Sequence, residues 1–152
     1  MGVPKNIQTA ITALQAFQSS NFPCFLSLFA QGGIGNLVGN NATIPDTSIP
    51  IIPFSGPYPI AEFLTLTTTY LVGTQISNPV SIEANSTITN VTFYVNLTAA
   101  ARCSPTGTVG STITVPTVLH FLFNPCGQIA ELDLYTDVSS LALFYALKCT
   151  PV

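Results

Sequence analysis

A chain of 152 residues has the length of one domain, and with only 6% charged side chains and a net charge of −3 it is unsuited to binding nucleic acid. Its basic residues Lys5, Arg102 and Lys148 are far apart in the sequence, so they predict no patch for phosphates or anionic lipid. Apolar residues make up 47% of the chain, yet polar residues, Pro and Gly interrupt every run before the roughly 18 residues of a membrane span. Something other than charge must cover the surface, and we expect glycan or a neighbouring subunit.

The first third of the chain predicts two helices. Residues 7–18 carry apolar side chains at helical spacing, which is typical of an amphipathic helix. A second, shorter helix is expected after Asn21 and through the segment CFLSLFA, with Gly32 and Gly33 ending it. Residues 34–55 are rich in Gly, Pro, Asn and Thr and predict a short strand followed by a long irregular segment.

The remainder predicts one more helix and then strands. The segment GPYPIAEFLTLTTTYL predicts a helix that starts at Pro57 or Pro59. Apolar and polar side chains then alternate over 91–99, which predicts a strand with one buried and one polar face. A further strand is expected up to Phe123, a tight turn at 124–127, and a last strand over QIAELDLYTD. Helices followed by an antiparallel meander indicate an α+β domain.

Three segments resemble the SnoaL-like polyketide-cyclase family of the nuclear-transport-factor-2-like superfamily. ALQAFQSSNFPCFLSLFA resembles its opening helix pair, FSGPYPIAEFL its Gly-x-x-x-Ile-x-x-Phe helix start, and HFLFNPCGQIAELDLYTDVSSL its last hairpin. The resemblance implies a single SnoaL-like domain over 1–152, cone-shaped, with N-terminal helices packed on a curved antiparallel sheet around an apolar pocket. Gln128 stands where that family has Lys, and Thr136-Asp137 replaces an aromatic-Asp pair, so the family's acid/base residues transfer only weakly.

Four Asn-x-Ser/Thr sequons begin at Asn41, Asn85, Asn90 and Asn96. They predict N-linked glycans and an extracellular or cell-surface location, although the opening MGVPKNIQTA lacks the pattern of a signal peptide. In a chain this rich in Asn, Ser and Thr, chance alone would give about two sequons. The alternative is therefore ordinary Asn/Thr-rich strands; with glycan, the sequons of the strand region would put sugar on one outer wall.

The four cysteines predict disulfides rather than a metal site. They have no Cys-x-x-Cys spacing and the chain has one histidine, so we expect neither a metal nor a cofactor. Two bonds suit an oxidising compartment, and of the three pairings Cys24–Cys126 with Cys103–Cys149 is favoured on the inferred topology. The alternative is four free thiols.

The last predicted strand carries candidate acid/base groups. Glu131, Asp133, Tyr135 and Asp137 alternate and would share one face. Facing a pocket, paired carboxylates could transfer protons beside a carbonyl group; facing outward, they are solubilising charges, and we favour the outward interpretation for Glu131 and Asp133. Asp137 could instead cap a following helix.

Two other residues complete the weak catalytic candidates, which are His120, Asp137 and Glu62. His120 lies in the middle of a predicted strand and is either a general acid/base or, more commonly, a hydrogen-bonded structural histidine. Glu62 either points into the cone or, as we favour, faces solvent in the first turn of the third helix.

Two functional hypotheses follow. The favoured one is an extracellular, N-glycosylated structural protein that assembles into an oligomer or filament, with assembly arms at 1–6 and 148–152 docking on the next copy. The other is a SnoaL-like isomerase or cyclase, or a carrier, that acts on a small apolar ligand such as a polyketide or terpenoid.

Overall fold

The computed structural model describes residues 3–38, 56–70, 75–100 and 112–136 of the chain. Three helices and seven strands are found there. In chain order they are α1 (Lys5–Gln18), α2 (Phe22–Ser27), β1 (Phe29–Val38), β2 (Gly56–Pro59), α3 (Ile60–Tyr70), β3 (Gln75–Ile76), β4 (Ser81–Ala84), β5 (Asn90–Ala100), β6 (Thr112–Phe123) and β7 (Ile129–Thr136). None of these helices is long and apolar enough to cross a membrane.

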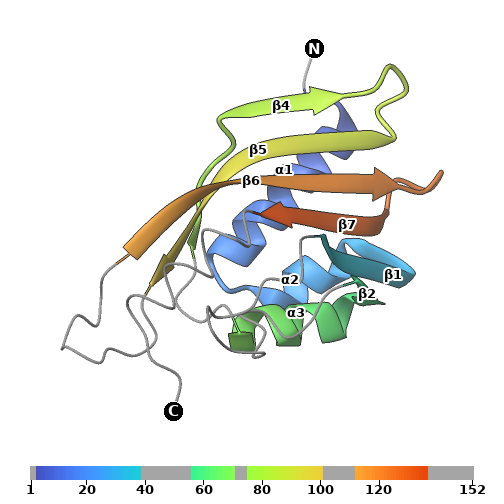
Figure 1. Ribbon diagram of the computed structural model, residues 1–152. Helices are drawn as coiled ribbons and strands as arrows, with labels where there is room; N and C mark the ends of the chain where they lie inside the picture. The colour runs from blue at the N-terminus through green and yellow to red at the C-terminus, as the bar shows by residue number, and fades with distance from the viewer. Residues whose placement is uncertain (1–2, 39–55, 71–74, 101–111, 137–152) are drawn as a thin grey trace, which may run out of the picture.

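The strands form one sheet in the order β2-β1-β7-β6-β5-β3, and β4 pairs with β5 beyond this path. Figure 1 shows the strands bending together, with the helices gathered on one side of them. The expected α+β arrangement of N-terminal helices on a curved sheet is confirmed. The sheet is mixed, however, because β1 runs parallel to β7. The backbone N–H of Ile129 donates to the carbonyl of Leu28. This bond holds the end of α2 beside the start of β7, where β1 begins.

Two helix boundaries differ from the sequence-based prediction. The second helix does not continue to Gly32 but ends at Ser27, because the chain pairs with β7 from Phe29 onward. The third helix starts at Ile60, since residues 56–59 form an edge strand against β1. An edge position tolerates the missing N–H groups of the two prolines in this segment.

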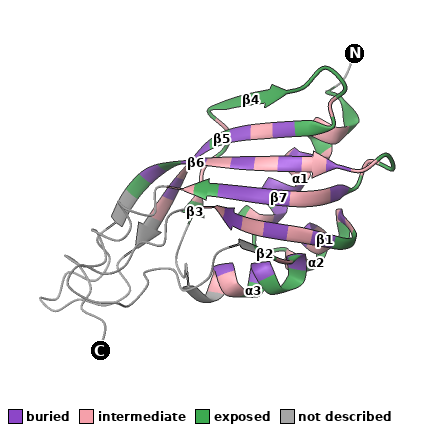
Figure 2. Cartoon of the chain, turned by 45° about the vertical axis from the view of Figure 1, so that its right-hand side comes forward, coloured by how far each residue is buried: buried purple, intermediate pink, exposed green. Residues whose placement is uncertain are grey.

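The alternation predicted over 91–99 is confirmed for the side chains that the structure describes. Val91, Phe93, Val95 and Leu97 are buried beneath the helices, while the intervening residues face the other side of the sheet (Figure 2). Phe93 meets Phe121 of β6 edge-to-face, with ring centroids 5.3 Å apart. This contact ties the longest hairpin of the sheet to the centre of the core.

The predicted tight turn between β6 and β7 is also confirmed. The Asn124 side-chain oxygen accepts hydrogen bonds from the backbone N–H groups of Cys126 and Gln128. Gly127 adopts a φ of +79°, which a residue without Cβ reaches at little cost. The turn residues favour the hairpin that places β7 beside β6.

The expected N-terminal assembly arm at 1–6 overlaps the first helix. Lys5 and Asn6 form the beginning of α1, and the Asn6 amide donates to the backbone carbonyl of Ile88 at 2.7 Å. This end of the chain therefore binds the chain's own β4–β5 loop. The second expected arm, at 148–152, lies outside the described residues.

The packing of α3 on the sheet depends on one glycine. A Cβ at Gly35 of β1 would overlap the ring of Phe63 from α3. The absence of a side chain lets that ring lie directly on the strand. The contact sets how closely α3 approaches the sheet.

We expect Gly35→Ala to destabilise the protein by about 1–3 kcal/mol, because the added methyl must displace a ring in a packed core. Urea denaturation measures the loss. The control is the same substitution in a Phe63→Leu background, where the smaller side chain should relieve part of the clash. An equal cost in both backgrounds would show that the Phe63 ring is not the cause.

Candidate ligand-binding cavity

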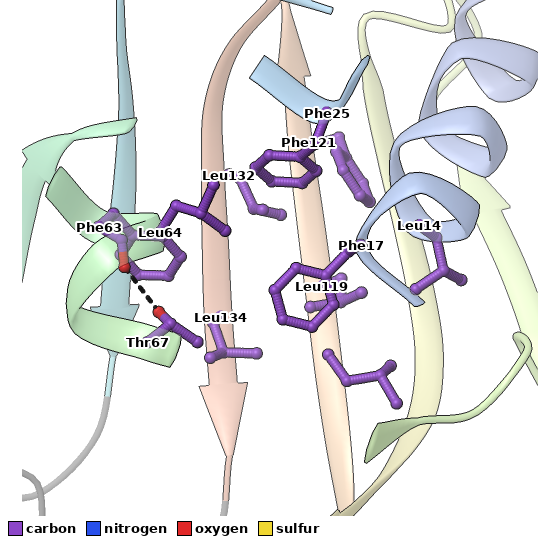
Figure 3. A pocket seen from close by; sticks show the side chains of 11 residues that line it. Leu14, Phe17, Phe25, Phe63, Leu64, Thr67, Leu119, Phe121, Leu132 and Leu134 are labelled. Atoms are coloured by element: carbon purple, nitrogen blue, oxygen red, sulfur yellow. Dashed lines mark hydrogen bonds between the residues drawn. The ribbon is translucent and has the colours of Figure 1, made fainter. Parts of the chain in front are cut away.

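An apolar cavity lies between the inner face of the sheet and the three helices (Figure 3). Its volume is about 30 Å³, far below the roughly 150 Å³ of an apolar cavity that holds a benzene ring, so it admits a group of only a few atoms. The lining side chains come from α1, α2, α3, β3, β6 and β7. They are Leu14, Phe17, Phe25, Phe63, Leu64, Thr67, Ile76, Leu119, Phe121, Leu132 and Leu134.

Local sequence patterns explain why these side chains point inward. On β6, Leu119 and Phe121 occupy alternate positions and are opposite Leu134 and Leu132 of β7. Paired residues of neighbouring strands project to the same face, so all four face the helices. In Figure 3, Phe63 and Leu64 of α3 lie on one side of the cavity, and Leu14 and Phe17 of α1 lie on the other.

Aromatic rings form the wall that α1 and α2 contribute. The rings of Phe17 and Phe25 are 6.0 Å apart and tilted by 58°, and Phe25 in turn lies 5.0 Å from Phe29. Tilted contacts at these distances are favourable beyond the area they bury. The wall is a packed cluster rather than a set of separate side chains.

The lining offers almost no polar chemistry. Among the described residues of the lining, Thr67 alone has a side-chain oxygen, and its hydroxyl donates to the backbone carbonyl of Phe63 at 2.8 Å (Figure 3). Thr67 is buried, and its hydroxyl bonds within its own helix. None of these described lining side chains is ionisable.

The candidate catalytic residues lie elsewhere. His120 alternates with the inward-facing Leu119 and Phe121 and therefore projects from the outer face of the sheet. Glu62 is exposed in the first turn of α3, as the solvent-facing interpretation predicted. Asp137 lies outside the described residues. The structure brings none of the described candidates to the cavity.

The outer face instead carries a polar row that crosses five strands. Register places each member opposite the next, from β1 through β7, β6 and β5 to β4. The row is Asn36, Asp133, His120, Thr92 and Glu83. Sequence reasoning could not find it, because its members belong to five separate segments.

Asp133 is the unusual member of this row. It faces away from the cavity, as favoured, but it is only 5% exposed and is not the solubilising charge that we expected. Its Oδ2 lies 3.5 Å from His120 Nδ1, while its Oδ1 is buried without a hydrogen-bond donor. Glu131 is the neighbour that could supply a proton. A hydrogen bond to Asp133, then partial burial, then the Asp133 charge raise the pKa of Glu131.

The raised pKa of Glu131 predicts a pH-dependent stability. Because the folded-state pKa of Glu131 is raised above its ordinary value of 4.5, folding favours the protonated form. This contribution is complete below about pH 4.5 and is lost as the pH rises through the raised pKa. Glu131→Gln should therefore gain stability relative to wild type between pH 4 and pH 7, measured by urea denaturation along that range.

The matched control is Glu62→Gln, which removes an exposed carboxylate from α3. It should keep the wild-type dependence of stability on pH. A Glu131→Gln variant with an unchanged pH profile would show that folding does not raise the pKa of Glu131.

The sequon asparagines occupy different environments. Asn85 organises the β4–β5 loop: its Oδ1 accepts from the N–H groups of Thr89 and Asn90, and its Nδ2 donates to the hydroxyls of Thr87 and Thr89. Glycosylation would replace one of the two Nδ2 hydrogens. Asn90 is exposed and Asn96 is half-buried on the outer face, whereas Asn41 lies outside the described residues.

The loop contacts predict a structural role for Asn85 that does not require sugar. In protein produced without glycosylation, Asn85→Gln should lose about 1–2 kcal/mol of stability, because several hydrogen bonds lose their geometry. Asn90→Gln, five residues away and exposed, should stay within about 0.5 kcal/mol. Thermal and urea unfolding compare the two. Equal small effects would mean that the Asn85 contacts contribute nothing net.

The expected Cys24–Cys126 disulfide is not formed in this structure. Cys24 packs against the core from α2, whereas Cys126 is exposed in the β6–β7 turn, and both are free thiols. That turn lies near the start of α1, where the Gly127 backbone approaches Lys5 and Asn6. Cys103 and Cys149 are outside the described residues. In the described part of the chain no three His, Cys, Asp or Glu side chains gather as metal ligands.

Comparison with solved structures identifies the fold. An NTF2-like protein of unknown function from Burkholderia pseudomallei superposes with a TM-score of 0.69 at 14% identity, covering 97% of this chain and 100% of that one. A protein assigned as a SnoaL-like polyketide cyclase from Jannaschia sp. CCS1 gives 0.63 at 18% identity, covering 99% of both chains. TerC, co-crystallised with polyporic acid, gives 0.68 at 15% identity over 90% of this chain and 95% of its own.

The chain therefore has the nuclear-transport-factor-2-like fold of the SnoaL-like proteins, as the sequence resemblance implied. No protein-family description matches the sequence, and neither does any curated protein. At these identities the likeness establishes the fold alone, and the function must be argued from the site.

Proposed function

We propose that this protein binds a small apolar ligand in the cone cavity and acts as a carrier or binding module. The observation that carries the proposal is the lining itself, in which ten apolar residues accompany one threonine whose hydroxyl is already bonded. Such a lining gains free energy from apolar contact, at about 25 cal/mol per Å² of surface removed from water. It offers no described group to move a proton or attack a bond.

Solved structures of the same fold support a role with small molecules. TerC was crystallised with polyporic acid, and SalBIII is described as an epoxide hydrolase/cyclase-like enzyme with a role in pyran ring formation. Both have this fold, and both handle small molecules. Binding is the part of that behaviour that the cavity of this chain supports. An isomerase or cyclase would also need an acid or base at the cavity, and Asp137 is the remaining sequence candidate for it.

Filling the cavity should abolish binding. Leu119 points into it, while the adjacent Val118 is half-buried on the outer face. Leu119→Phe should weaken the binding of xenon, an apolar probe smaller than a benzene ring, at least tenfold because the new ring occupies the site. Val118→Phe, the same side chain one residue away, should leave affinity within about twofold. Ligand-detected NMR measures binding, with circular dichroism to confirm folding. Equal effects of both variants would place the ligand elsewhere.

Glycosylated, extracellular self-assembly stays a second proposal. It is supported by the 6% charge content and by the exposed rings of Tyr94 and Tyr135 on the same face as Asn90 and Asn96. Glycans at the two asparagines would compete with a partner for that face, so both features need testing together. Intact mass before and after deglycosylation, run with light scattering, does this. An unmodified monomer at high concentration would overturn the proposal.

A further inference from the structure

We infer that the cavity selects hydrocarbon and discriminates against ligands that bring a hydroxyl or other hydrogen-bonding group into it. The expected ligand places a small hydrocarbon group of a few atoms in the cavity, and any polar group that it carries must stay outside. This inference rests on the proposed function and specifies the chemistry that the site accepts.

The side chains of the lining have little hydrogen bonding to offer a ligand. Of the described lining residues, Thr67 alone has a side-chain oxygen, and its hydroxyl hydrogen is used by the Phe63 carbonyl within α3. Helical geometry supplies this bond locally, because a Thr hydroxyl reaches the carbonyl four residues earlier. A ligand hydroxyl that competed for it would break an existing buried bond to form its own.

The backbone of the lining residues is engaged in hydrogen bonds of its own. Leu119 and Phe121 lie on β6, which pairs with β5 on one side and β7 on the other, while Leu132 and Leu134 lie on β7 between β6 and β1. Strands in the middle of a sheet use their N–H and C=O groups on both sides for ladder hydrogen bonds. Most of the other lining residues belong to helices, whose backbone groups are bonded internally. The cavity wall therefore has few main-chain partners to offer.

The consequence is a measurable selectivity. A hydroxyl that leaves water without gaining a hydrogen bond loses roughly tenfold to a hundredfold in affinity relative to an apolar group of the same size. Small size limits affinity as well, since even very good small ligands gain at most about 1.5 kcal/mol per non-hydrogen atom. We therefore expect weak binding with strong discrimination.

Toluene and phenol are the matched probes, because each is a benzene ring with one substituent of similar size. We expect folded Leu119→Ala, in which the lost side chain enlarges the cavity, to bind toluene at least about tenfold more tightly than phenol, measured by NMR titration of the protein's methyl and aromatic signals. Wild-type protein, with its cavity of about 30 Å³, should bind both rings more weakly than this variant and should take up xenon.

The outcomes separate the two claims. Phenol binding as tightly as toluene would overturn the selectivity while leaving apolar-ligand binding intact. If neither toluene nor xenon binds to wild type or to folded Leu119→Ala, both the selectivity and the proposed function fail. Signals that shift on the outer face rather than at Leu132 and Phe121 would also overturn both.

Two further substitutions, each made in the Leu119→Ala background, test the cause. Thr67→Val removes the hydroxyl, and because that group is already bonded within α3, the preference for toluene should change less than about twofold. A large increase in the preference would mean that Thr67 serves the ligand. Leu134→Asn introduces an amide into the wall and should reduce the preference, provided that circular dichroism shows a folded protein; an unchanged preference in that folded variant would contradict the proposed cause.

Discussion

The register of β6 between β5 and β7 is the constraint on which the rest of the structure depends. It directs Leu119 and Phe121 toward the helices and His120 away from them. Because side chains alternate with a period of two, a slip of one residue would exchange the two faces along the whole strand. The apolar inner face and the turn at Asn124 oppose such a slip, the first through burial and the second through its hydrogen bonds.

This register separates two kinds of chemistry. Inside, mostly leucine and phenylalanine side chains line a cavity, and none of its described lining residues is ionisable. Outside, Asp133 and His120 meet across two strands in a polar row. His120 therefore lies beside the buried Asp133 carboxylate, on the face of the sheet opposite the cavity. The Asp133–His120 pair is thus separated from the cavity by the thickness of the sheet.

Much of the fold could be predicted from local patterns. Three predictions depended only on residues close together in the sequence, and each is confirmed. They are the helix over 7–18, the alternating strand over 91–99 and the turn at 124–127. The predicted end of the second helix was wrong, because the backbone pairs with β7, a strand distant in sequence, from Phe29 onward. At the cavity, the sequence indicated apolar faces, but it could not show that Thr67 bonds within its own helix and leaves the space without polar partners.

By itself the sequence determined the class of the domain, its sparse charge and the residues that alternate on β5 and β6, since these depend on composition and short periods. Only the tertiary structure decided which face each candidate residue occupies. An extra residue near Ala130 shifts the register between β6 and β7, so that Ile129 and Leu132 both lie in the core and Glu131 and Asp133 turn outward. That outcome depends on pairing between separate segments, which no local pattern encodes.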